Sequence, residues 1–259
     1  MTMPFYVAPE QVMKDRADYA RKGIARGRSL TALVYDEGIL ICAENPSNTL
    51  RKVSEIYDRI AFAGVGRYSE YDQLRIAGVR HADLKGYSFS REDVDARSLA
   101  NQYAQILNQV FTHDIKPLEV DILVAEVAQT GRDQLYHILY DGTILDDTHY
   151  SVLGGETDAI GDRLEASWRE GLTLGDALIA AVDALAGPDR TLVADDIEVA
   201  VLRRDDSRRA FRRIEGAALA ELLPEPAEAA PEPSAVGDDA GQREQHGNDE
   251  HEGDQPPVA

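Results

Sequence analysis

The chain has 259 residues and 43% of them are hydrophobic, so it can bury a sizeable core in one large domain or two small ones. Its formal net charge of −20 disfavours binding to nucleic acid or to an anionic membrane. The single cysteine, Cys42, excludes an intramolecular disulfide framework and a zinc ribbon, and the lack of a long apolar run or a signal pattern leads us to expect a cytoplasmic protein.

A short segment without a hydrophobic pattern, residues 1–8, begins the chain, and we expect a helix to follow it. Pro9 suits the first turn of a helix, where its missing N–H would have no intrahelical acceptor. Four apolar residues then recur at spacings of four, three and four and define one face: Met13, Ala17, Ala20 and Ile24. The pattern predicts a helix from Pro9 to about Gly27.

Two pairs of strands are expected next. Residues 30–35 and 39–43 flank a short turn that ends in Gly38, which is typical of a β-hairpin. Nearly every residue in both runs is apolar, which indicates strands that are covered on both faces. Residues 52–57 and 59–66 form the second predicted pair.

Helices and then strands follow this second pair. We expect a charged helix over 68–85 and another helix that ends before a break at 112–117. The dipeptide Asp141-Gly142 is a strong hairpin signal. It lies within a predicted set of four strands: 120–127, 134–140, 143–145 and 150–153.

The last part of the patterned sequence predicts two helices, two strands and a short helix that ends near residue 223. Thr173 is expected to cap the second of the two helices, and Gly187 to end it. The strands are expected at 197–202 and 211–214. Strands covered on both faces, followed twice by helices, predict an α+β fold in which two stacked sheets lie between outer helices, a four-layer αββα sandwich.

The composition changes at residue 224. The last 36 residues contain ten acidic residues, one arginine and six of the eleven prolines. Such a segment has too little apolar surface to offset the entropy lost on ordering. We therefore expect a disordered acidic tail over 224–259.

The order of elements and three sequence segments resemble subunits of the proteasome core particle, which have the N-terminal-nucleophile hydrolase fold. The segments are FYVAPEQVMKDRADYARKGIARGRS, AENPSNTLRKVSEIYDRIAFAGVGRYSEYDQLR and IEVAVL…RRAFRRI. The resemblance covers residues 1 to about 223 and is strongest to the α-type subunits of actinobacterial 20S proteasomes. It implies a gate segment at 1–8, an αββα domain at 9–223 and a separate tail.

The resemblance also bears on catalysis. In β-type subunits a threonine at the start of the first strand is the nucleophile, and its own free α-amine is the base. The corresponding position here is near Arg28, and arginine cannot take either role because it stays protonated. We also expect the helix that begins at Pro9 to cover this position. The resemblance thus implies a non-catalytic subunit of a threonine-type endopeptidase complex, and no cofactor or metal is expected, since no histidine has the spacing of a metal ligand.

The resemblance assigns two further sets of residues. The segment that would form the gate of the axial entrance comprises Thr2, Met3, Pro4, Phe5, Tyr6, Val7 and Ala8. Lys52 matches a lysine that pairs with the C-terminal carboxylate of an activator in the pocket between neighbouring α subunits. Gly66 matches a glycine that admits this tail, and Asp18 lies where the family has an acidic residue near the pocket. Without the resemblance, Lys52 would be read as a solvated lysine and Gly66 as the end of a strand.

These residues favour a role as scaffold and gate. The resemblance implies a heptameric α ring that supports assembly of the β ring and docks a ring-shaped ATPase for Pup-linked protein degradation. One alternative is an autonomous amidohydrolase of the same fold with Ser29 or Thr31 as its nucleophile. Another is a binding module unrelated to proteolysis.

Overall fold

The computed structural model describes residues 8–47, 49–205 and 207–223. Ala8 is the one described residue of the expected gate segment, because residues 2–7 lie outside the described residues. The expected disordered tail, residues 224–259, also lies outside them. Within the described part, no helix is both long enough and apolar enough to cross a membrane.

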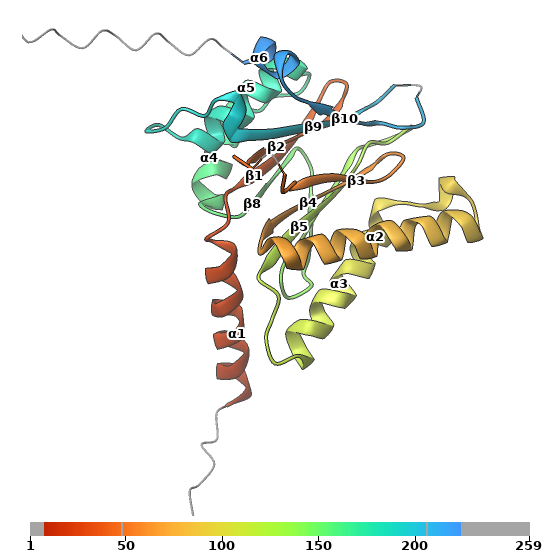
Figure 1. Cartoon of the computed structure of the whole chain (residues 1–259), viewed down its shortest axis with the longest axis vertical. Helices are drawn as coiled ribbons and strands as arrows, with labels where there is room; N and C mark the ends of the chain where they lie inside the picture. The colour runs from red at the N-terminus through yellow and green to blue at the C-terminus, as the bar shows by residue number, and fades with distance from the viewer. Residues whose placement is uncertain (1–7, 48, 206, 224–259) are drawn as a thin grey trace, which may run out of the picture. The chain divides into compact units, whose positions relative to one another are not determined.

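Two five-stranded antiparallel sheets form the centre of the fold (Figure 1). The first sheet has the order β10-β9-β2-β1-β8, with the strands Phe211–Ile214, Ile197–Arg203, Gly38–Glu44, Leu30–Tyr35 and Tyr150–Leu153. The second sheet has the order β3-β4-β5-β6-β7, with the strands Val53–Tyr57, Ile60–Gly66, Val120–Glu126, Gln134–Ile138 and Ile144–Asp147. The hairpin between β1 and β2 pairs Leu30 with Ala43 at its open end and Tyr35 with Gly38 at its turn.

Helices cover the outer face of each sheet. The second sheet packs against α2 (Tyr68–Ser88) and α3 (Ala96–His113), and the first packs against α4 (Thr157–Ser167) and α5 (Leu174–Ala186). The short helix α6 (Ala217–Leu222) adds Leu219 to the cluster over the first sheet. The predicted αββα order of layers is confirmed.

The alternation of side chains along β5 shows why its sequence is apolar throughout. Leu123 and Ala125 lie in the cluster shared by the two sheets, whereas Ile122 and Val124 pack against the helical layer of α2 and α3. All four side chains are fully buried. A strand covered on both faces must be apolar at every position, and this is the pattern that the sequence predicted.

The predicted turns are present, and several boundaries shift by a few residues. Gly142 has a φ of +88°, and its N–H donates to the carbonyl oxygen of Leu139 at 2.9 Å. Because the hairpin bonds already include Leu139, β6 ends at Ile138, two residues before the predicted end. Lys52 precedes β3, which begins at Val53.

The N-terminal helix α1 (Pro9–Ile24) corrects one expectation. It contacts β4 and β5, and Arg16 donates to the carbonyl oxygens of Phe111 at 2.7 Å and Val110 at 3.1 Å, at the end of α3. Only Ala20 and Ile24 of the helix are buried, and Figure 1 shows α1 extending away from the sheets. The helix therefore does not cover the start of β1, and its turns are held by the second sheet and α3 instead.

Candidate functional site

The start of β1 lies in a cavity of about 400 Å³ lined by Arg28, Ser29, Glu44 and Arg190, among others. The Glu44 side chain is buried, at 7% exposed, and its Oε1 pairs with Arg28 Nη1 at 2.7 Å and with Arg190 Nη1 at 3.1 Å. Both arginine side chains are half exposed at the rim. One buried carboxylate thus holds two guanidinium groups at the position where a catalytic subunit would have its nucleophile.

The hydroxyl groups near this position are not arranged for catalysis. Ser29 is buried, and its Oγ donates to the carbonyl oxygen of Gly154 at 3.3 Å. Thr31 is fully buried within β1. Peptide bonds join both residues to the chain that comes from α1, so neither has the free α-amine that would act as the base.

Lys52 lies directly beside this cluster. Its Nζ donates to the backbone carbonyl oxygen of Arg28 at 2.5 Å. The protein around the partly exposed ammonium displaces water and lowers the pKa of Lys52 to about 8. Glu44 and Glu198 oppose this shift, and Arg28 adds to it. The sequence placed Lys52 in a carboxylate-binding pocket, and the structure places its ammonium next to a second cationic residue.

Glu198 fixes the backbone at Lys52 and was missed by the sequence analysis. Its Oε2 accepts from the backbone N–H of Lys52 at 2.8 Å and from Asn45 Nδ2 at 2.8 Å. Its Oε1 accepts from Arg213 Nη1 at 2.6 Å. A lone carboxylate inside the apolar run IEVAVL was the available signal, because a charged residue is almost never fully buried unless it is paired.

Gly66 ends β4 in a backbone conformation that demands glycine. Its φ is +104°, and a Cβ would collide with the carbonyl oxygen of Glu119. Gly27 packs closely against it, since a Cβ on Gly27 would lie 2.9 Å from the Gly66 nitrogen. The structure thus brings Gly66 to the segment between α1 and β1, and the backbone alone accounts for the residue type.

A charged network continues from Gly66 along the start of α2. Lys116 Nζ lies 2.7 Å from Glu70 Oε1 and 2.9 Å from Glu119 Oε1, and Arg67 Nη2 lies 2.9 Å from the same Glu119 oxygen. Burial alone would raise the pKa of Glu119, but Lys116 and Arg67 outweigh it and hold the pKa below its ordinary value. Ion-paired side chains therefore lie around the end of β4.

Comparison with known proteins decides the family. The model of the family "Proteasome subunit" matches residues 24–202 of the chain. The chain belongs to the proteasome subunit family.

Similar proteins place it among the α-type members. A proteasome subunit alpha from Acidimicrobium ferrooxidans is 60% identical over 224 residues, which cover 86% of this chain and 97% of the relative. One from Xylanimonas cellulosilytica is 58% identical and covers 85% and 95%. One from Saccharopolyspora erythraea is 53% identical over 253 residues and covers 96% and 99%.

This α-type proteasome subunit is a non-catalytic part of the 20S core particle, the protein-degrading assembly that also contains β subunits. The prediction that it is not the catalytic chain is confirmed, and Arg28 at the start of β1 gives the physical reason. The alternatives of an autonomous amidohydrolase and of a binding module unrelated to proteolysis are wrong.

Asp18 is not joined to the other two expected pocket residues in this α-type subunit. It lies on α1, is partly exposed and pairs with Arg21 at 3.1 Å. Across the described ranges, no hydrogen bond or ion pair links it to Lys52 or Gly66. Arg21 in turn lies over the ring of Tyr140, with 5.7 Å from its Cζ to the ring centroid, so this face of α1 points toward the end of β6.

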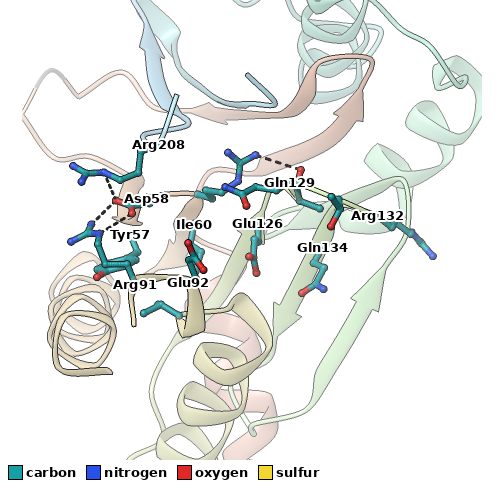
Figure 2. A pocket seen from close by; sticks show the side chains of 14 residues that line it. Tyr57, Asp58, Ile60, Arg91, Glu92, Glu126, Gln129, Arg132, Gln134 and Arg208 are labelled. Atoms are coloured by element: carbon teal, nitrogen blue, oxygen red, sulfur yellow. Dashed lines mark hydrogen bonds and ion pairs between the residues drawn. The ribbon is translucent and has the colours of Figure 1, made fainter. Parts of the chain in front are cut away.

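A second cavity, of about 570 Å³, lies at the turn between β3 and β4 and was not predicted. Figure 2 shows Arg91 and Arg208 on either side of Asp58 at its rim. Arg91 Nη2 lies 2.6 Å from Asp58 Oδ1, and Arg208 Nε lies 3.7 Å from the same oxygen. Inside the cavity, burial raises the pKa of Glu126, which accepts from the N–H of Ala96 at 2.7 Å. Asp58 is thus already paired with two arginines of the same chain.

Metal binding receives no support from the side chains. Within residues 8–47, 49–205 and 207–223, no group of three or more histidine, cysteine, aspartate or glutamate side chains is arranged to hold a metal ion.

Proposed function

We propose that this α-type subunit forms part of the gated entrance of the core particle and docks the C-terminal tail of a regulatory ring ATPase. The observation that carries the proposal is the position of the Lys52 ammonium, which is partly exposed beside Arg28. A terminal carboxylate is a suitable ligand for such an ammonium, because an ion pair would replace a hydrogen bond to a neutral backbone carbonyl.

Three details support Lys52 as the docking residue. Glu198 binds the backbone N–H of Lys52, so the base of the side chain is fixed. Protein around the partly exposed ammonium displaces water, and this strengthens its interaction with an incoming anion. Gly66 presents bare backbone near the same segment of chain, next to Gly27. Asp18 remains in the proposal only as a partly exposed acidic residue on α1.

The remaining parts of the proposal rest on the resemblance to actinobacterial α subunits. They are a heptameric α ring that supports assembly of the β ring, a gate formed by residues 1–8, a domain over 9–223 followed by a separate tail, and a cytoplasmic location. We also assign the ATPase to the Pup-linked route.

The substitution Lys52→Ala tests the docking site. In core particles reconstituted with the β subunit, we expect basal hydrolysis of a small peptide to stay unchanged, because Lys52 belongs to the non-catalytic subunit. Stimulation by the ATPase, or by a peptide of its C-terminal tail, should be lost.

Lys85→Ala is the matched control, since it removes another partly buried lysine. Lys85 lies on α2 and pairs with Asp95 at 2.8 Å. It should leave stimulation intact. Undiminished stimulation of the Lys52→Ala particle would show that the tail docks elsewhere.

A further inference from the structure

One lateral edge of the sandwich carries an acidic groove, a cavity of about 640 Å³ between α4, β8 and the strands β5, β6 and β7 of the second sheet. Among the residues that the structure describes, no lysine or arginine lines it, and five carboxylates do: Asp121, Asp147, Asp158, Asp162 and Glu165. We propose that this groove receives the arginine-bearing opposite edge of a second copy of the chain. The inference rests on the proposed ring and specifies which two faces meet in it.

Three buried polar groups in the groove lack a partner. Asp121, His137 and Ser151 are 8%, 7% and 2% exposed, and all three line the groove. Asp121 Oδ1, His137 Nε2 and Ser151 Oγ accept or donate no hydrogen bond within the described part of the chain. The nearest approach is 3.8 Å, between His137 Nε2 and Asp121 Oδ2, which is too long for a hydrogen bond.

Such groups point to a missing donor. Buried polar atoms in native proteins are almost always hydrogen-bonded, and an unpartnered buried carboxylate oxygen is costly. A guanidinium group brings five N–H donors and a positive charge, so it fits both the Asp121 oxygen and the acidic surround. The groove is therefore incomplete within one copy of the chain.

The rim of the groove is also uncompensated. Asp158, Asp162 and Glu165 are exposed and spaced by four and three residues, which places them on one face of α4. Among the described residues, none of the three forms an ion pair within 4.0 Å. Like charges at this spacing repel one another, and a cationic partner would relieve the repulsion.

The opposite edge of the sandwich carries arginines. β10 and β3 are the edge strands there, and Arg209 of the loop before β10 pairs with Glu55 of β3 at 2.6 Å. Arg208 and Arg212 are exposed on the same edge, and Arg208 also lies 3.7 Å from Asp58 Oδ1. Arg212 Nη1 donates to the backbone carbonyl oxygens of Arg209 at 2.8 Å and Phe211 at 2.9 Å, so this guanidinium binds neutral acceptors.

A second copy of the chain is the occupant that fits both edges. In a closed ring of identical subunits each contact joins two different faces, head to tail. The two lateral edges of this sandwich differ in this way, because one is acidic and unpaired and the other presents arginines. Burial of both edges would also protect the outer strands β8 and β10 from pairing with other proteins.

Charge reversal tests the contact in the full chain co-expressed with the β subunit. The double variant Asp158→Lys, Asp162→Lys reverses the rim of the groove, and Arg212→Glu reverses the facing edge. Either change alone should lower the fraction of chain in full-size particles about tenfold or more, measured by analytical ultracentrifugation, because like charges then meet. The triple variant should recover most of the assembly.

A matched control keeps the total charge change and moves it away from the edges. Asp183→Lys with Glu221→Lys alters two exposed acids on α5 and α6 and should assemble as the wild type does. Circular dichroism of each variant confirms that the chain is folded. Full assembly of the groove variant, or failure of the triple variant to recover, would overturn the inference. A groove variant that forms a normal α ring and loses only the β subunit would also overturn it. Absence of any ring from the wild-type chain would instead contradict the proposed function.

Discussion

At the scale of single residues, two buried carboxylates organise the cations around the start of β1. Glu44 ends β2 and binds Arg28 and Arg190, while Glu198 of β9 binds Arg213 and the backbone of Lys52. β2 and β9 are hydrogen-bonded neighbours, so the two acids lie in one sheet at the same end of the strands. Removal of Glu198 would leave the buried Asn45 amide and the Lys52 N–H without this acceptor, whereas removal of Glu44 would release two half-exposed arginines.

The pKa of Lys52 gives a prediction about stability and pH. It is about 8 in the folded chain and 10.5 for an unperturbed lysine, so between these pH values the unfolded chain binds more protons than the folded one. Stability therefore rises with pH across this window. Urea unfolding at pH 7.5 to 10.5 should show the wild type gaining stability relative to Lys52→Gln.

The unfolding series has its own control. Lys22→Gln removes an exposed lysine from α1 and should follow the wild type at every pH. A constant difference between the wild type and Lys52→Gln would mean that Lys52 keeps its ordinary pKa in the folded chain.

Residue identity was predictable from the sequence only where a position has a family counterpart. Lys52, Gly66 and the departure at Arg28 were found in this way. The partners of these residues were not, because Glu198 lies 146 positions beyond Lys52 and Arg190 lies 146 positions beyond Glu44. Contacts over such distances are created by strand order, which no local pattern encodes.

At the scale of elements, α1 connects the expected gate to the body of the chain. Pro9 is its first residue, and the carbonyl oxygen of Ala8 accepts from the N–H of Gln11 at 2.9 Å. Val12, Met13 and Tyr19 are exposed apolar side chains on this helix. Such a helix has surface left for a neighbouring subunit, in accord with the proposed ring.

Removal of residues 2–8 tests the gate. In reconstituted core particles the deletion should raise the rate of hydrolysis of a small peptide, because the expected plug is gone while Pro9 can still begin the helix.

The comparison variant replaces residues 2–8 by seven glycine and serine residues. It shows whether closure depends on the length of the segment or on its side chains. A deletion particle that cleaves peptide no faster than the wild type would remove these residues from the gate.

The elements themselves were largely predictable, since hydrophobic period and turn residues are local properties. The sequence predicted all ten strands, with small shifts such as those at the start of β3 and the end of β6. The wrong expectation concerned where α1 lies. Its apolar face is narrow, and period alone does not say which layer of the sandwich a helix will contact.

At the scale of the whole molecule, the chain is built to act within an assembly. Catalysis requires the β subunit, because the start of β1 holds Arg28 and no nucleophile. The acidic groove, with Asp121 and His137 on neighbouring strands and Asp158 on α4, could not be foreseen, since these residues are far apart in sequence and only the stacking of the sheets brings them together.

The particle formed with the β subunit provides the test at this scale. Co-expression should give a complex with seven-fold symmetry and peptide-hydrolysing activity, and the chain alone should have no such activity. Native mass spectrometry and class averages from electron microscopy measure both mass and symmetry. A monomeric chain in the presence of the β subunit would contradict the proposed scaffold role.

The single bond from the Lys52 ammonium to the Arg28 carbonyl has a mechanical consequence. Arg28 lies in the short connection between α1 and β1, so this bond fastens the base of the N-terminal helix to the start of β3. An anion that drew the ammonium away would remove this bond four residues after the helix ends, while Glu44 would still hold the Arg28 side chain. Docking at the proposed site would then be coupled to the connection between the N-terminal helix and β1 through one backbone oxygen.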